Sequence, residues 1–259
     1  MPFLASGPHN LYVVLLIMLR ASGLVVSAPM LGSKTLPPTM LMGISFLLAI
    51  CMAPMASHIV GPLPVSLIAL GFQAVQNLLF GLAIGYTARL MFAAVEIAGA
   101  ITDLQMGFGF INLVDPFSQQ QVSLVGAFYY QLSIVLYMMM NGHLLLIGAL
   151  EKSLQVLPPD QIGIGSGVGP AIFPLIKVML LLGLQLALPA IGVLLLVDVG
   201  FGLMARMAPQ VNIFIVGMPA KILMGLMTVS LLVPALALIV GQIIPGIATG
   251  LNALMTGAR

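Results

Sequence analysis

Residues 222–258 read ILMGLMTVSLLVPALALIVGQIIPGIATGLNALMTGA, a run without a single charged side chain. An α-helix needs about 20 apolar residues to cross the hydrocarbon core of a bilayer, so this run is long enough for at least one span. Inside lipid the backbone must satisfy its own hydrogen bonds, which leaves helices or a closed barrel. The run is continuously apolar rather than alternating, and that pattern favours helices. The predicted fold class is therefore all-α.

Two more uncharged runs, residues 35–88 and 116–150, extend the same pattern to about half of the chain. Of the 259 residues, 61% are hydrophobic and 5% are charged, whereas an ordinary soluble domain has about 25% charged residues. Such a composition cannot form a water-soluble surface, so we expect a membrane protein in contact with lipid. A formal net charge of +2 argues against nucleic-acid binding. No linker or short repeat divides residues 1–259, which we predict to be a single domain.

Proline and glycine divide the apolar sequence into six or seven expected helical segments. The first is predicted at residues 11–28 and the second at 40–52, ending near Pro54. Residues 65–106 are too long for one upright span, so they form either a hairpin broken near Gly81 to Gly85 or two helices in line, and we expect a break. A Gly-x-x-x-Gly pair also permits close helix contact. Later segments are expected at 122–150, at 171–205 with an interruption at Pro189, and at 213–244 with bends or ends at Pro219, Pro234 and Pro245.

Three charged residues, Arg89, Glu96 and Asp103, stand seven positions apart, which on an α-helix places them along one stripe. A charge at the bilayer centre costs about 2.5–3.5 kcal/mol, so this stripe requires partners or water rather than lipid. A stretched Arg89 side chain can reach Glu96, whereas Asp103 needs a separate donor. Its candidate partners are Arg20, Lys177 and Lys221; Asp198 is expected to take one of the same cations, and Arg206 completes the set of charges predicted to be buried or at a subunit interface.

Three interpretations of these charges stay open: structural ion pairs, a proton or ion relay, and groups that line an aqueous path or a subunit interface. Ser166 has no histidine at a spacing that predicts catalysis, and consecutive methionines at 138–140 are typical of packing rather than copper binding. We therefore predict no enzyme activity, no metal site and no cofactor.

Residues 107–121 should be non-helical, because they contain two glycines, Asp115-Pro116 and three consecutive glutamines. A loop of this kind is usually polar. This one is instead rich in apolar side chains, which are Phe108, Phe110, Ile111, Leu113, Val114 and Phe117.

Four strings, in order along nearly the whole chain, resemble one known family. They are SAPMLGSKTLPP at residues 27–38, LQMGFGFINLVDPFSQQQ at 104–121, Asn141-Gly142-His143, and RMAPQVNIFIVGMPAKILMG at 206–225. These strings are similar to the FliR family of flagellar biosynthetic proteins, the FliR/SctT family of the type III secretion export apparatus.

The resemblance implies a subunit of the flagellar export gate, located in the bacterial inner membrane as part of the basal body. The family assembles with FliP and FliQ, and FlhB associates with that complex, which passes unfolded flagellar proteins across the membrane. It also implies bent helical hairpins in which FliP-like and FliQ-like parts are joined.

The family's loop that corresponds to residues 107–121 is similar to a plug that closes the pore. In that role Phe108, Phe110, Leu113 and Phe117 are expected to form the seal, and Gly107 and Gly109 to let the loop move. The alternative for the loop is a buried packing element. The alternatives for the whole chain are the homologous subunit of a virulence injectisome and, in a different class, a small-solute secondary transporter.

Overall fold

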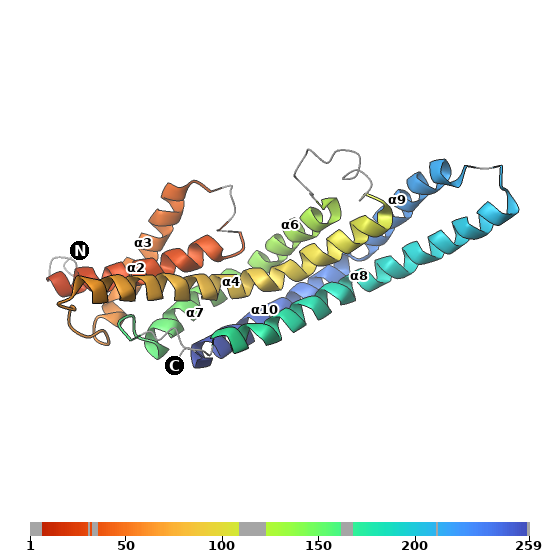
Figure 1. Ribbon diagram of the computed structural model, residues 1–259. Helices are drawn as coiled ribbons and strands as arrows, with labels where there is room; N and C mark the ends of the chain where they lie inside the picture. Colours follow the sequence, from red (N-terminus) through yellow and green to blue (C-terminus); the bar gives the residue numbers. More distant parts are fainter. Residues whose placement is uncertain are drawn as a thin grey trace. The chain divides into compact units, whose positions relative to one another are not determined.

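The computed structural model describes residues 7–30, 32, 36–108, 123–161, 168–210 and 212–257. Within these ranges the chain forms eight helices and no strand (Figure 1). The helices are α2 (Pro8–Ser27), α3 (Pro38–Ala56), α4 (Leu67–Met106), α6 (Leu124–Met139), α7 (Gly142–Val156), α8 (Val168–Met207), α9 (Ile213–Leu231) and α10 (Val233–Gly257). The predicted all-α fold is confirmed.

Five of these helices, α2, α3, α4, α8 and α10, are long and apolar enough to cross a membrane. A sixth span is available if α6 and α7 together count as one interrupted span. These helices fit a multi-pass membrane protein.

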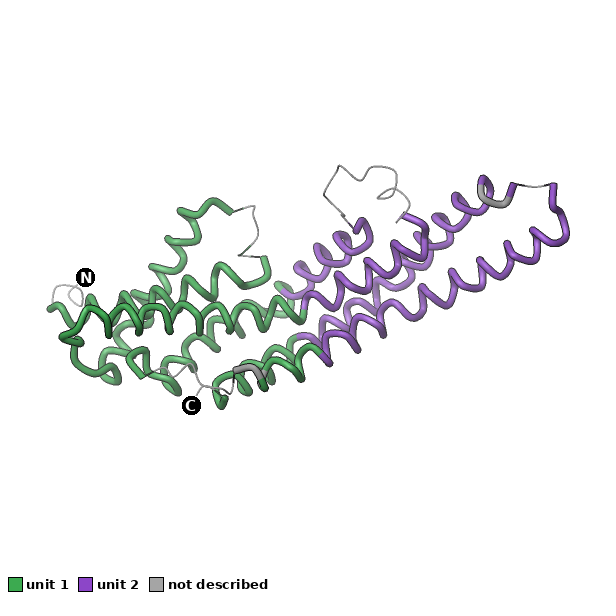
Figure 2. The backbone as a smooth tube through the Cα atoms, in the orientation of Figure 1, with its two compact units in different colours: residues 1–91, 138–176, 244–259 green, residues 92–137, 177–243 purple. Residues whose placement is uncertain are grey.

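The chain forms two compact units, coloured separately in Figure 2. Unit 1 contains residues 1–91, 138–176 and 244–259, and unit 2 contains residues 92–137 and 177–243. Helices α4, α8 and α10 each contribute residues to both units. A single domain over residues 1–259 remains a prediction.

Helix α4 continues without interruption through the glycines at which a break was predicted, so that prediction is wrong. In unit 1, a Cβ atom at Gly81 would collide with the backbone of Arg20, and one at Gly85 would collide with the Ser27 hydroxyl on α2. The two glycines therefore allow α2 and α4 to approach backbone to backbone. The unusual backbone angles that glycine can adopt are not needed here, because both closely packed helices keep a regular helical backbone.

The predicted interruption at Pro189 is wrong, because α8 continues through this proline. Helix α3 contains Pro54 and ends at Ala56, so the predicted end near Pro54 is confirmed. A proline removes one backbone donor and strains one turn. The apolar residues on both sides still favour helix, since lipid offers the backbone no other hydrogen-bond partner. The predicted end near Pro234 is confirmed, because α10 begins at Val233.

Residues 122–150 were predicted as one helix, and this prediction is also wrong, because they form α6 and α7. Asn141, between them, has left-handed backbone dihedral angles, with φ at 57°. Asparagine adopts this conformation more readily than other non-glycine residues. The helix is therefore interrupted at a residue that can adopt the left-handed backbone angles required there.

The core of unit 2 contains an aromatic contact between α4 and α6. Phe92 packs edge-on against Tyr137, with ring centroids 5.2 Å apart, and against Tyr130 at 6.1 Å. Edge-to-face aromatic pairs contribute about 0.5–1.5 kcal/mol beyond the area they bury. This contact holds α6 against the second half of α4, where the candidate site lies.

Candidate functional site

Asp103, in the last turn of α4, lies at the N-terminus of α6. Its carboxylate accepts a hydrogen bond from the Ser123 hydroxyl at 2.5 Å and from the Val125 backbone N–H, whose nitrogen lies 3.2 Å from both carboxylate oxygens. The Ser123 hydroxyl oxygen in turn accepts a bond from the Gly126 N–H at 2.9 Å. Side chains that accept from the first turn of a helix cap it, and a negative charge there also interacts favourably with the helix dipole.

The partner of Asp103 among the described residues is therefore a helix end and a hydroxyl. The prediction that Arg20, Lys177 or Lys221 would supply its donor is wrong. Backbone N–H groups at a helix N-terminus have no partner within their own helix, so they satisfy a buried carboxylate without a second charged side chain.

The same residue takes part in the end of α4. The Phe108 N–H donates to the Asp103 carbonyl at 3.0 Å, and the Gly107 N–H donates to the Leu104 carbonyl at 3.2 Å. Gly107 has a φ of 92°, in the left-handed region. This pair of bonds is the Schellman arrangement that ends many helices at a glycine. Asp103 thus holds the end of α4 through its backbone and the start of α6 through its side chain.

Two glycines bring α4 and α6 together one turn away from this cap. A Cβ atom at Gly99 would collide with the backbone of Gly126, and one at Gly126 would lie 3.1 Å from the Glu96 carbonyl oxygen. Only glycine permits helix backbones to approach so closely. The close crossing brings the Asp103 side chain within reach of the first turn of α6.

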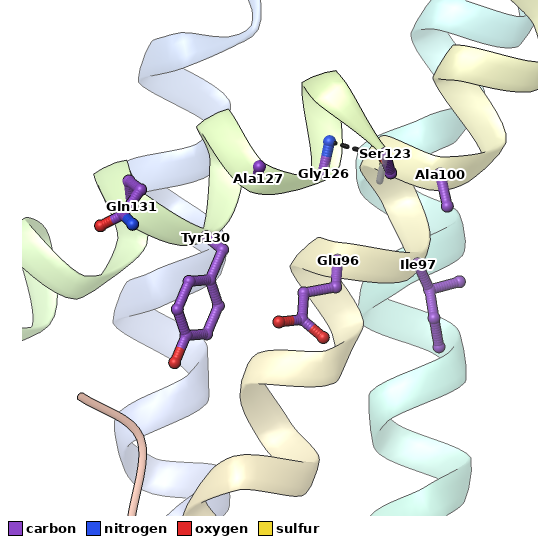
Figure 3. Close-up of a pocket in the computed structure, with 8 residues that line it drawn as sticks. All are labelled: Glu96, Ile97, Ala100, Ser123, Gly126, Ala127, Tyr130 and Gln131. Atoms are coloured by element: carbon purple, nitrogen blue, oxygen red, sulfur yellow. Dashed lines mark hydrogen bonds between the residues drawn. The ribbon is translucent and has the colours of Figure 1, made fainter. Parts of the chain in front are cut away.

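A hollow of about 500 Å³ lies beside this crossing, within unit 2 (Figure 3). We call it the Glu96 hollow. Its lining residues come from α4, from α6 and from Ser123 just before α6; they are Glu96, Ile97, Ala100, Ser123, Gly126, Ala127, Tyr130 and Gln131. Glu96 is exposed, and its side chain extends toward the side of the hollow on which Tyr130 lies (Figure 3). The hollow combines one carboxylate, an aromatic ring, an amide and a surface of small side chains.

Arg20 is fully buried in unit 1, where all its described partners are uncharged. Its Nε donates to Asn77 Oδ1 at 3.0 Å, and one terminal nitrogen donates to the carbonyl oxygens of Ser153 and Leu157, each at 3.0 Å. Both carbonyls lie at the C-terminal end of α7, where a cation interacts favourably with the helix dipole; the Ser153 carbonyl also accepts the Leu157 backbone N–H at 3.0 Å. The guanidinium carbon lies 5.3 Å from the centre of the Phe80 ring. Arg20 therefore joins α2, α4 and α7.

The remaining predicted charges fall into two groups. Lys221 on α9 and Asp198 on α8 form an ion pair with 2.8 Å between the ammonium nitrogen and a carboxylate oxygen, so the predicted pairing of Asp198 with a cation is confirmed. Arg89, Lys177 and Arg206 are exposed on the chain. The stripe predicted from Arg89, Glu96 and Asp103 thus has two exposed members and one buried member.

The family described as Bacterial export proteins, family 1, matches residues 11–246. Flagellar biosynthetic protein FliR of Escherichia coli strain K12 is 34% identical over 220 residues, which are 85% of this chain and 84% of that protein. The chain belongs to the FliR family. The FliR of Bacillus subtilis strain 168 is 33% identical, over 80% of this chain and 81% of that protein. The FliR of Caulobacter vibrioides is 28% identical, over 89% of this chain and 92% of that protein.

Membership of the FliR family makes the chain a component of the flagellar export apparatus. Its long apolar helices fit a multi-pass membrane protein. Of the residues that the resemblance assigned to a plug, Gly107 and Phe108 lie at the end of α4. The others, Gly109, Phe110, Leu113 and Phe117, lie outside the described residues. The role of the segment as a plug stays a prediction.

Sequence reasoning missed three residues that build this site: Ser123, Gly99 and Gly126. Ser123 carried a usable signal, because serine directly before an apolar helical run is a preferred helix cap. No sequence pattern marks Gly99 and Gly126 as a contact, since the pairing of two glycines on different helices depends on the tertiary fold.

Proposed function

We propose that this FliR-family chain is a non-catalytic subunit of the flagellar type III export gate. In this role it assembles with homologues of FliP and FliQ, and an FlhB homologue associates with the complex. The assembly forms the pore that passes unfolded flagellar proteins across the bacterial inner membrane. The observation that carries the proposal is the family match over residues 11–246.

The surface of the chain supports a role within a larger assembly. Large apolar side chains are exposed along α8 and α9, for example Leu196 at 74% and Leu231 at 79% of their accessible surface. Lipid alone can cover such side chains. Lys177 and Arg206 are both exposed on α8, and charges at membrane depth require a polar partner or water. A surface that combines both suits contact with other protein subunits as well as lipid.

Within this proposal, residues 107–121 form the plug of the pore, as the family resemblance implies. Support comes from the described residues beside the segment: the Phe108 N–H, near its start, donates to the Asp103 carbonyl, and the hydroxyl of Ser123, just after it, donates to the Asp103 carboxylate. Deletion of residues 107–121 is expected to raise the leakage of small ions through the assembled gate, and unchanged leakage would remove the plug assignment.

The test of the proposed function is complementation in a flagellated bacterium that lacks its own FliR. The full chain should restore secretion of hook protein into the medium and should copurify with the FliP and FliQ homologues in one complex whose mass is measured. Two results contradict the proposal. One is recovery of the stable chain alone, without these partners. The other is solute transport by the purified chain in liposomes, which identifies a secondary transporter.

A further inference from the structure

Unit 1 contains a second hollow, of about 210 Å³, between α7 and α10. We call it the Lys152 groove. Its apolar lining includes Leu145, Leu251 and Met255, and its polar side chains are Lys152 and Asn252. The groove therefore combines an apolar wall with a polar spot that carries a positive charge.

The polar spot offers several hydrogen-bond donors to an anion. The Lys152 ammonium nitrogen donates to Asn252 Oδ1 at 2.8 Å, so this bond uses one of its three donors and leaves its charge in place. The amide nitrogen of Asn252 has two further donors, and both side chains are exposed. Glu151, next along the chain, points about 100° away around α7 and does not line the groove. An ammonium and an amide that line one groove suit a phosphate group.

Both polar residues lie near the ends of apolar helices. Lys152 stands before the end of α7 at Val156, and Asn252 before the end of α10 at Gly257, which is about 6–8 Å along each helix axis. Helix α10 is long and apolar enough to cross a membrane, and α6 and α7 together fit one interrupted span. Lysine near the end of a membrane helix extends toward the headgroup region, and basic pockets between such helices bind anionic lipid headgroups. This position favours the phosphate of a lipid over an anion dissolved in water.

Gly148 keeps the apolar part of the groove open. It is exposed on α7, one turn before Lys152, and a Cβ atom added to it would meet no other atom within 4 Å. Beside it on the same helix, Leu144 and Ile147 are exposed apolar side chains. The groove thus opens onto a surface that suits the hydrocarbon of a bilayer, and an acyl chain that fills the space at Gly148 gains dispersion contacts with its lining.

We propose that the Lys152 groove binds an anionic phospholipid, with the phosphate on Lys152 and Asn252 and an acyl chain along Gly148 and Leu145. The proposal goes beyond the proposed function, since it concerns contact with the membrane and requires no particular partner subunit. An acidic segment of another protein offers the same charge but no acyl chain, and the apolar wall of the groove favours the lipid.

The test uses the full chain in detergent, together with any subunits that copurify with it. The chain contains no tryptophan, so Leu144→Trp places a single reporter beside the groove, and the preparation without this substitution supplies the background. Bromine quenches tryptophan fluorescence at short range, so dibrominated phosphatidylglycerol, which is anionic, is compared with dibrominated phosphatidylcholine, which has no net charge. One lysine contributes about fivefold to the binding of anionic lipid. We therefore expect half-maximal quenching at an about fivefold lower mole fraction of phosphatidylglycerol.

Three substitutions in the groove test its charge and its space. Lys152→Met removes the ammonium, and Asn252→Asp places a carboxylate beside it with little change of size, so each should abolish the preference for phosphatidylglycerol. Gly148→Leu fills the groove from a position with open surroundings and should lower quenching by both lipids. The matched control is Lys177→Met, which removes the same charge from an exposed position on α8 in unit 2 and should keep the preference.

Three results overturn the lipid site. The first is equal quenching by both lipids, or a preference that survives both Lys152→Met and Asn252→Asp. The second is the absence of quenching in the chain with its copurified subunits, which shows that protein covers the groove instead. The third is displacement of phosphatidylglycerol by millimolar inorganic phosphate, which assigns the site to a free anion; we expect no displacement, because inorganic phosphate has no acyl chain. None of these results bears on the proposed function, which complementation and copurification test separately.

Discussion

Replacement of Asp103 should release the first turn of α6 selectively. The carboxylate accepts hydrogen bonds from the Ser123 hydroxyl and the Val125 N–H, and it lies at the positive end of the α6 dipole. Hydrogen bonds to a charged group contribute about 1.5–3 kcal/mol each, and a charge at a helix end adds about 0.3–1 kcal/mol. Fraying of the helix end lets water satisfy part of the freed groups, so we expect Asp103→Ala to cost about 3 kcal/mol locally.

A local loss of about 3 kcal/mol corresponds to roughly 150-fold faster opening, because each 1.4 kcal/mol is a factor of ten. The measurement is amide hydrogen exchange of Val125 and Gly126 in the purified complex. Asp103→Asn keeps one carbonyl acceptor but loses the charge, so it should accelerate exchange by about tenfold. The control is Thr102→Val, because the Thr102 hydroxyl donates only to the Ala98 carbonyl of its own helix at 2.9 Å. Exchange in Asp103→Ala that matches Thr102→Val, or that rises equally at every amide, would refute the capping role.

Three further predictions concern packing and charge. Gly99→Ala should lower the free energy of unfolding by about 1–3 kcal/mol, measured by thermal unfolding of the complex, because the added methyl group pushes α4 away from α6. The control is Gly192→Ala, which has open space around it and should be neutral or stabilise by up to about 1 kcal/mol. Arg20→Met should cost about 3–5 kcal/mol and reduce the amount of accumulated protein, because it removes the buried hydrogen bonds to Asn77, Ser153 and Leu157 that join three helices; accumulation equal to that of the unchanged chain would contradict this. A double-mutant cycle of Asp198→Asn and Lys221→Met in detergent should give a coupling below about 1 kcal/mol, because both side chains are partly exposed.

The helical class of this chain follows from composition alone, because a continuous apolar sequence leaves the backbone one way to satisfy its hydrogen bonds in lipid. Helix ends were harder to predict. Proline is a typical helix breaker, yet Pro189 lies inside α8, where the apolar residues on both sides keep the helix intact. Gly81 and Gly85 were ambiguous between a break and a close contact, and only the position of α2 decides between them.

The site shows the same limit. Asp103 was correctly singled out as a charge in need of a donor, but its donor is a backbone group that exists only once α6 has formed. A search for oppositely charged side chains cannot find such a partner. The partners of Arg20 were equally hard to find, since its described acceptors are the Asn77 side-chain amide, the Ser153 hydroxyl and two carbonyl oxygens, all from residues distant in the sequence.

The charges of this chain differ in their burial. Asp103 is buried and accepts hydrogen bonds at the start of α6, and Arg20 is buried and donates to carbonyl oxygens at the end of α7 and to the Asn77 side chain. Arg89 and Glu96 lie on the same helix as Asp103 and are exposed. The Asp103 carboxylate is held by the start of α6 in the same chain, so its contribution to the fold does not require a neighbouring subunit. Substitution of Asp103 should therefore accelerate exchange in the first turn of α6 to a similar extent in the separate chain and in the assembled complex, and an effect confined to the complex would contradict this.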